Sequence, residues 1–262
     1  MAEPPSTSEL ATRLRALTQA RIALGRTGQS LTTTALLDFE LAHARARDAV
    51  LTDLDTDALR TTLADRDVVE VHSRAGDRAT YLQRPDLGRL LDPADAALLM
   101  PSGATLAIVI GDGLSATAVH RHAAPLVAAL AARLGAWSIA PIVVAHHTRV
   151  ALGDEIGAAL GVDMLVMLIG ERPGLSAPDS LGAYLTWAPR PGRRDSERNC
   201  VSNIRPPHGL GYAAAAHRIG WLVDAARAIG LTGVGLKDEC PPEDAPAAID
   251  RSIALPAGSR LP

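Results

Sequence analysis

Three continuous apolar runs, separated by stretches with helical character, constrain the fold of this chain more than any other feature of its sequence. The runs occupy residues 106–110, 139–145 and 164–169. Strands that are buried on both faces of a parallel sheet show such unbroken hydrophobicity. Between them lie an Ala-rich stretch at residues 115–134 and a shorter one at residues 154–160, both typical of helices. This alternation predicts an α/β domain built on a doubly wound, Rossmann-like parallel sheet.

The chain before these runs has a different pattern. An apolar stripe that starts at Leu10 predicts a first helix, which Gly25 is expected to end. Two more helices are predicted at residues 34–50 and 57–63, and weak alternation at residues 68–72 predicts a short strand.

The chain after the apolar runs completes the expected domain. Residues 183–187 are a candidate fourth strand, and residues 212–229 predict a last helix that stops at Gly230. The change of pattern near residue 100 divides the chain into two expected parts. A mainly helical N-terminal region spans residues 1–100, and the Rossmann-like domain spans residues 101–262.

Composition and charge exclude several classes of function. The 262 residues carry a net charge of −3, which gives no electrostatic footprint for nucleic acid. Two cysteines cannot form a disulfide framework and no secretory signal is evident, so we expect a cytoplasmic protein. Residues 123–145 are long and apolar, but Pro125, Gly135 and Pro141 divide them into a helix and a strand. No membrane span is therefore expected.

A glycine-containing loop follows the first apolar run. Residues 111–116 (GDGLSA) fit the spacing of dinucleotide-binding loops and lie between a predicted strand and a predicted helix. Such sites also place an acidic residue about twenty positions further on, and no Asp or Glu occurs between Gly113 and Asp154. A stand-alone Rossmann-type dinucleotide-binding oxidoreductase is thus the alternative function. The structural alternative is a tight turn in which Ser115 caps the helix.

The histidines lack the spacing of a metal site. His146 and His147 are adjacent and His120 and His122 lie two apart, whereas ligands on one helix are three or four residues apart. We expect partly exposed histidines and no bound metal.

Three blocks combine glycines with charged or reactive side chains, at residues 148–155, 170–175 and 198–203. The acidic residues of the first block suit the first turn of a helix on dipole grounds alone. Its lead-in around Val150 is small and apolar instead, which suits a backbone that runs past a flat ligand.

The other two blocks leave alternatives open. Glu171 follows the third apolar run, where a carboxylate can accept hydrogen bonds from a ligand or form an ion pair with Arg172 or Arg198. Cys200 lies in what reads as a polar, Arg-rich loop. Because sequence supplies no base for nucleophilic catalysis there, a packed or ligand-contacting thiol is expected.

The order and spacing of these blocks resemble one family, the small (light) subunit of ethanolamine ammonia-lyase. GERPGL at residues 170–175 and CVSN at residues 200–203 are the most specific parts. Further stretches that agree lie at residues 20–26, 38–48, 111–117 and 178–184. The resemblance covers nearly the whole chain, from about residue 10 to residue 238.

The resemblance implies a subunit of an adenosylcobalamin-dependent lyase that converts ethanolamine to acetaldehyde and ammonia. In that family a large (heavy) subunit, a barrel, holds the substrate. The small subunit closes over the corrin, and its N-terminal region contributes to assembly. The implied cofactor contacts fall on Val150, Glu171 and Cys200 of this chain. The implied enzyme is a hetero-oligomer, in the cytoplasm or inside a bacterial microcompartment.

The residues themselves agree with this division of roles. An apolar Val, a hydrogen-bonding Glu and a soft thiol suit a broad, mostly apolar corrin with amides on its rim. We find no set of catalytic acid, base and nucleophile, so no catalytic residue is assigned and the isolated chain is expected to be inactive. No histidine follows an Asp by two positions, so the chain is not expected to supply an axial ligand to cobalt. A non-catalytic interaction protein, with its helical N-terminal third docked on a partner, is a third hypothesis.

Overall fold

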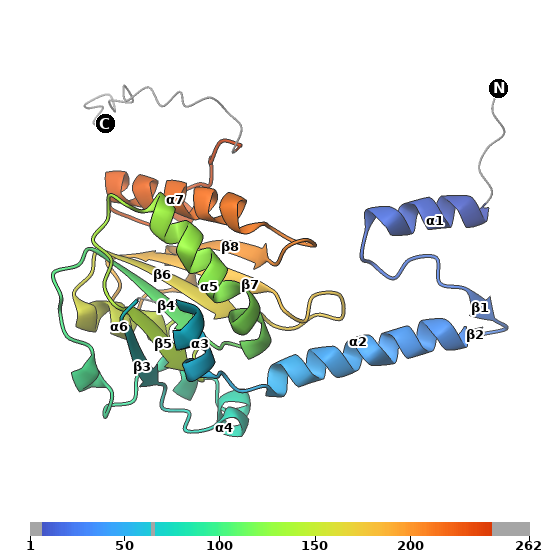
Figure 1. The fold of residues 1–262 in the computed structure, drawn as a ribbon, viewed down its shortest axis with the longest axis horizontal. Coiled ribbons are helices and arrows are strands. Elements are labelled where there is room, and N and C mark those ends of the chain that lie inside the picture. Colours follow the sequence, from blue (N-terminus) through green and yellow to red (C-terminus); the bar gives the residue numbers. More distant parts are fainter. Residues whose placement is uncertain (1–6, 64–65, 243–262) are drawn as a thin grey trace, which may run out of the picture.

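The computed structural model describes residues 7–63 and 66–242, and its main body is a six-stranded sheet with helices on both faces (Figure 1). The strand order across the sheet is β3-β5-β4-β6-β7-β8. The strands are β3 (Val68–His72), β4 (Leu106–Gly111), β5 (Ile142–His146), β6 (Met164–Gly170), β7 (Leu181–Trp187) and β8 (Asn199–Ile204). The α/β class expected from the apolar runs is confirmed.

The sheet is mixed rather than purely parallel. Strands β3, β5, β4 and β6 run parallel, as expected. Strands β7 and β8 are antiparallel to their neighbours, so the expectation of a parallel sheet is wrong for this part. The link between β6 and β7 is too short to contain a crossover helix, and a parallel pair needs such a connection.

Helices cover the two faces of the sheet unequally. Helices α3 (Thr56–Leu63), α5 (Ala116–Arg133) and α7 (Tyr212–Ile229) share one hydrophobic core with one face. Helix α6 (Leu152–Leu160) and side chains from residues 91–104 form a second core on the opposite face. This second layer packs mainly on β4, β5 and β6. On the same face of β7 and β8, Tyr184 is half-buried and Cys200 is exposed.

The strongest sequence patterns gave the most accurate boundaries. The last helix, α7, matches the expected residues, and Gly230 ends it with a positive φ of 70°. Helix α5 is continuous through Pro125 and is followed by a buried strand, as the division of the apolar stretch predicted. Within the described part of the chain, no helix combines the length and the hydrophobicity needed to cross a membrane.

An arm of two helices extends from this body (Figure 1). It consists of α1 (Thr7–Leu17), the two-residue strands β1 (Arg26–Thr27) and β2 (Ser30–Leu31), and α2 (Thr33–Leu51). The first helix ends at Leu17, not at Gly25 as expected, and residues 18–25 run to the small hairpin. Ala49 is the buried residue of α2. The arm therefore has almost no core of its own.

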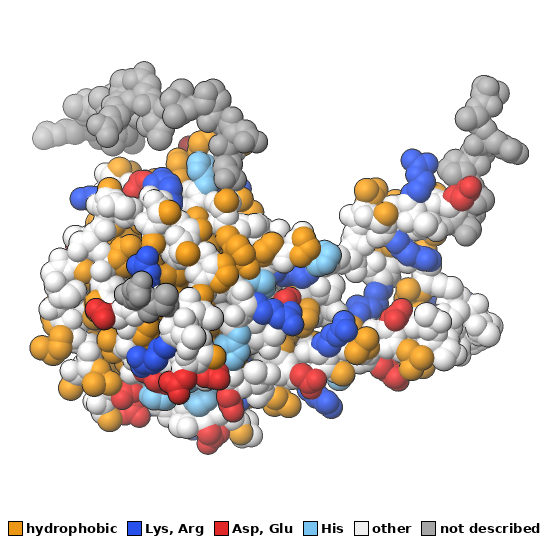
Figure 2. All heavy atoms as spheres, viewed as in Figure 1, with side chains coloured by type: hydrophobic (Ala, Val, Ile, Leu, Met, Phe, Trp, Pro, Cys, Tyr) orange, Lys and Arg blue, Asp and Glu red, His pale blue; other side chains and the backbone are white. Residues whose placement is uncertain are grey.

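Large apolar side chains remain exposed along the arm, and hydrophobic side chains are visible along it in Figure 2. They are Leu10, Leu14, Leu17, Leu24, Leu31, Leu36, Leu37, Phe39, Leu41 and Leu51. The body of the protein also takes in residues before position 101. Strand β3 pairs with β5, and α4 (Arg78–Gln83) lies beside the sheet rim.

Candidate functional site

The sheet has a topological switch point between β4 and β6. From β4 the chain passes through α5 to β5 on one side of it, then through α6 to β6 on the other side. Ligands of open α/β sheets bind in the crevice that opens at the carboxyl ends of such strands. Here the crevice consists of two adjoining cavities of about 410 and 370 Å³. Arg149, Val150 and Tyr184 line both of them.

The three residues singled out by the sequence lie around this crevice. Glu171 lines the first cavity, Cys200 lines the second, and Val150 lines both. They come from three separate elements, namely the turn before α6, the end of β6, and β8. The fold therefore brings together the side chains that the sequence separates by up to fifty positions.

The turn that carries Val150 is fixed by contacts on both sides. The carboxylate of buried Asp112 accepts hydrogen bonds from the backbone N–H groups of His147 and Thr148, each at 2.9 Å. The hydroxyl of Tyr81 donates to the carbonyl of Thr148 at 2.9 Å. Val150 therefore sits on a rigid support, and its half-buried side chain forms an apolar wall.

The same contacts account for the glycine loop at residues 111–116. Asp112 faces inward to the backbone of the neighbouring loop and to Arg78, at 3.0 Å. A Cβ added at Gly113 would overlap the carbonyl oxygen of Gly170, so this glycine allows two backbones to touch. Ser115 caps α5 by accepting a hydrogen bond from Ala118 N–H. The loop is thus a tight packing turn, which disfavours the dinucleotide alternative.

Glu171 is held at the mouth of the crevice by its own neighbours. Its Oε2 accepts hydrogen bonds from the Ser180 hydroxyl and from the Asn203 backbone N–H, the latter at 3.2 Å. A Cβ at Gly182 would lie 2.9 Å from Oε1, so this glycine leaves the space that the carboxylate occupies. The other carboxylate oxygen remains the one that can accept from a ligand.

The ion pair between Glu171 and Arg198, one of the alternatives left open by the sequence, does not form. Arg198 instead holds Asp154 in a bidentate pair, and both side chains are 2% exposed. This pair joins the first turn of α6 to the residue before β8, and Arg198 also lines the second cavity. Glu171 makes no ion pair with Arg172 or any other residue of the described chain.

Cys200 lies in a strand, which corrects the expectation of a polar loop. It belongs to the edge strand β8 and is the cross-strand partner of Tyr184 on β7. The thiol lies 3.1 Å from the hydroxyl of Ser202. Loss of contact with water raises the pKa of Cys200, which the hydrogen bonds with Ser202 and Tyr184 offset only in part. The thiol is therefore protonated at neutral pH and is a contact group rather than a nucleophile.

Two crevice residues were not assigned a role from the sequence. Tyr184 is half-buried, and burial followed by the neighbouring Cys200 raises its pKa, so it stays a neutral phenol. Arg149 stacks over the Tyr81 ring at 4.7 Å, and its buried Nε has no hydrogen-bond partner among the described residues. Tyr184 could have been found from strand alternation, which places it on the same face of the predicted strand as Gly182 and Thr186.

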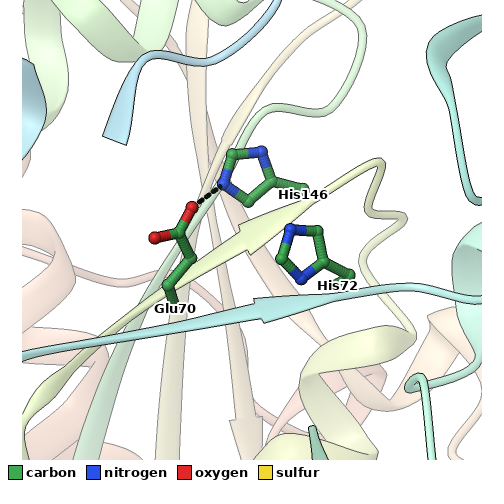
Figure 3. A group of neighbouring side chains, drawn as sticks. All are labelled: Glu70, His72 and His146. Atoms are coloured by element: carbon green, nitrogen blue, oxygen red, sulfur yellow. Dashed lines mark hydrogen bonds and ion pairs between the residues drawn. The ribbon is translucent and has the colours of Figure 1, made fainter. Parts of the chain in front are cut away.

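A second group of polar side chains lies outside the crevice. Glu70, His72 and His146 meet at the ends of β3 and β5, with one ligating atom of each within 4.8 Å of the others (Figure 3). His146 and His147 are both partly exposed, as expected. The sequence shows only that His146 is next to His147. It does not show that His146 lies opposite Glu70 and His72 of another strand.

Comparison with known proteins gives a consistent result. Residues 8–237 match the family model of the ethanolamine ammonia-lyase light chain (EutC). A protein of Rhodopseudomonas palustris named ethanolamine ammonia-lyase small subunit is 54% identical over 263 residues, covering 98% of this chain and 100% of that protein. Its namesake in Pseudomonas syringae pv. tomato is 52% identical, covering 86% and 82% of the two chains. Another, from Xanthomonas campestris pv. campestris, is 51% identical, covering 93% and 95%.

Proposed function

Because this chain belongs to the ethanolamine ammonia-lyase light-chain family, we propose that it forms one wall of the adenosylcobalamin site of that lyase. The lyase acts as a heteromer, and a large subunit would hold ethanolamine during its conversion to acetaldehyde and ammonia. The observation that carries the proposal is the crevice on the less covered face of the sheet. It brings Val150, Glu171 and Cys200 to one surface.

The residues of the crevice fit a corrin. Val150 and the ring of Tyr184 offer apolar surface to the macrocycle. Glu171 offers an acceptor and Arg149 a buried donor without a partner, and these match the two ends of a corrin side-chain amide. A corrin is wider than either cavity, and both cavities are open. A partner surface would therefore cover the opposite side of the ring.

Adenosylcobalamin held by Val150, Glu171 and Cys200 would supply the radical chemistry of the reaction. The contribution of this chain is to bind and orient the cofactor and to exclude water from one side of it. Cys200 is protonated at neutral pH and Glu171 is engaged by Ser180, so neither is poised as a nucleophile or base. The substrate chemistry therefore belongs to the partner, and we assign no catalytic residue to this chain.

We also propose a role for the arm in assembly. Its exposed leucines have no core to enter within the described chain, and exposed apolar surface of this extent marks protein interfaces. The arm would dock on the large subunit and give the hetero-oligomer. Partner contact would then belong to the arm, residues 7–51, whereas the expected division placed it in residues 1–100. Cofactor binding would involve residues 101–262 together with Tyr81 and Arg89, which also line the crevice. The Rossmann-like classification and a location in the cytoplasm or a microcompartment belong to the same proposal.

The decisive experiment uses the complex of this chain with the large subunit. Adenosylcobalamin is titrated into that complex. We expect a change in the visible spectrum and ethanolamine turnover by the complex, and no turnover by this chain alone. Val150→Asp places a charge on the apolar wall and should weaken cofactor binding at least tenfold. Val234→Asp is the matched control, since Val234 is 84% exposed and lines neither cavity.

Two results would overturn the proposal. One is turnover by the isolated chain. The other is unchanged cobalamin affinity of the complex with Val150→Asp. Binding of nicotinamide nucleotides in place of cobalamin would revive the dinucleotide alternative.

A further inference from the structure

We propose that Glu70, His72 and His146 form a binding site for a divalent transition metal ion of the zinc type. The three side chains are outside the crevice and have no role in the proposed cofactor site. Figure 3 shows the Glu70 carboxylate and the two imidazoles turned toward one another. Their ligating atoms all lie within 4.8 Å of one another. Two histidines and one glutamate are a recurrent ligand set for zinc.

Strand geometry places the three residues together. His72 and His146 are directly opposite each other on the parallel strands β3 and β5. Glu70 is two residues before His72, so it projects from the same face of β3. The two imidazole rings stack with their centroids 4.8 Å apart. All three ligands thus sit on paired strands, which hold a metal site more firmly than loops.

The surroundings of His72 support a metal site independently. Its Nδ1 lies 2.9 Å from the carboxylate of Asp95, which also accepts a hydrogen bond from the His72 backbone N–H at 2.7 Å. Nδ1–H donation to Asp95 fixes the tautomer and leaves a lone pair on Nε2. Metal-ligating histidines commonly have such a carboxylate on their other nitrogen. Asp95 would therefore orient His72 for the metal.

The contact between Glu70 and His146 marks where the ion would sit. Oε1 of Glu70 and Nε2 of His146 are 2.8 Å apart, and the Thr56 hydroxyl lies 2.8 Å from each. Nε2 of His146 now shares a proton with the carboxylate. On metal binding that proton leaves to solvent, and the metal accepts the lone pairs of Nε2 and Oε1 in its place. A small turn of the half-exposed His72 ring closes the set.

The location suggests what the ion does. Thr56 begins α3, and the short link before it joins α3 to the end of α2. The cluster therefore lies at the root of the arm and ties the edge strand β3 to its neighbour. A metal here would brace the junction between the arm and the sheet.

The test is zinc titration of the full-length chain, freed of metal with a chelator and without cobalamin. Isothermal calorimetry should show one saturable Zn²⁺ site per chain. His72→Ala and His146→Ala should each remove it, and Glu70→Gln, which preserves side-chain size, should weaken it strongly. Asp95→Asn leaves all three ligands in place and should lower the affinity by about 10- to 100-fold.

The matched control is His208→Ala, which removes an exposed histidine on the loop after β8. It should bind zinc like the unaltered chain. X-ray absorption at the zinc edge should show two imidazole nitrogens, a signature that folding defects cannot imitate. Absence of saturable binding, or unaltered affinity in both Glu70→Gln and Asp95→Asn, would overturn the proposal.

Discussion

The guanidinium of Arg198 grips the carboxylate of Asp154 at both oxygens, with nitrogen–oxygen distances of 2.6 and 2.7 Å. The pair connects the first turn of α6 to the residue before β8. Residues of both segments line the second cavity, with Val150 just before α6 and Cys200 on β8. The ion pair therefore links the two segments that line the proposed cofactor site.

Removing one partner should destabilise the protein severely. Asp154→Ala leaves the Arg198 guanidinium buried without its counter-charge, so we expect a loss of about 3 to 5 kcal/mol in the free energy of unfolding. Urea denaturation measures this. Asp195→Ala is the control, because Asp195 lies 3.7 Å from the same arginine and is 82% exposed. It should change stability by less than about 0.5 kcal/mol; equal losses in both variants would contradict the assignment.

Glu171 should contribute to cofactor affinity through its position as well as its charge. Glu171→Ala is expected to weaken cobalamin binding by the assembled enzyme about ten- to hundredfold, as loss of a charged hydrogen-bond partner does. Gly182→Ala should also weaken it, because the new Cβ would displace the carboxylate. Gly135→Ala, where nothing lies within 4 Å of an added Cβ, is the control. Unchanged affinity in a spectroscopic titration of Glu171→Ala would remove this residue from the site.

Cys200 should react slowly with alkylating agents at neutral pH. Its pKa is raised above its ordinary value of 9.0, mainly through loss of contact with water, so the reactive thiolate accumulates only at higher pH. In a Cys240→Ser background, iodoacetamide labelling followed by mass spectrometry should speed up as pH rises past 9. Bound adenosylcobalamin should protect the thiol in the complex. Fast labelling at pH 7, or no protection by the cofactor, would count against a protonated thiol that contacts the cofactor.

The arm should be needed for assembly and not for folding of the body. Leu14→Asp combined with Leu37→Asp places charges on exposed apolar surface. The free energy of unfolding, measured by thermal denaturation, should therefore stay within about 0.5 kcal/mol of that of the unaltered chain. Co-elution with the large subunit should be lost. Val234→Asp, which places a charge on a more exposed apolar residue of the body, should still co-elute. Retained co-elution of the double variant would place the interface elsewhere.

Sequence patterns predicted best the elements that are buried along their whole length or end at a clear stop signal. Strand β6 is buried along its whole length and α7 ends at a glycine, so both were predicted almost to the residue. Strand β8 was missed because only Val201 and Ile204 face the core and a register shift interrupts its pairing with β7. An edge strand with few apolar residues resembles a loop in sequence.

The site was predicted unevenly for a related reason. Val150, Glu171 and Cys200 came from the resemblance to a family, and the structure places them around one crevice. The partner of Arg198 was left open, since Glu171 and Asp154 are both acidic and their distance from Arg198 in the sequence does not rank them. The Glu70, His72 and His146 cluster was missed because it depends on the pairing of β3 with β5. Long-range pairing is the information that local patterns lack.

The sparse cover over β7 and β8 has a thermodynamic consequence. A corrin lying on these strands has one side supported by this chain and the other side free for a second polypeptide. If the second polypeptide raises the affinity of this chain for cobalamin by some factor, then bound cobalamin must raise the affinity between the two polypeptides by the same factor. Saturating the enzyme with cobalamin should thus slow the exchange of its subunits. The cofactor would stabilise the assembly in addition to its part in the reaction.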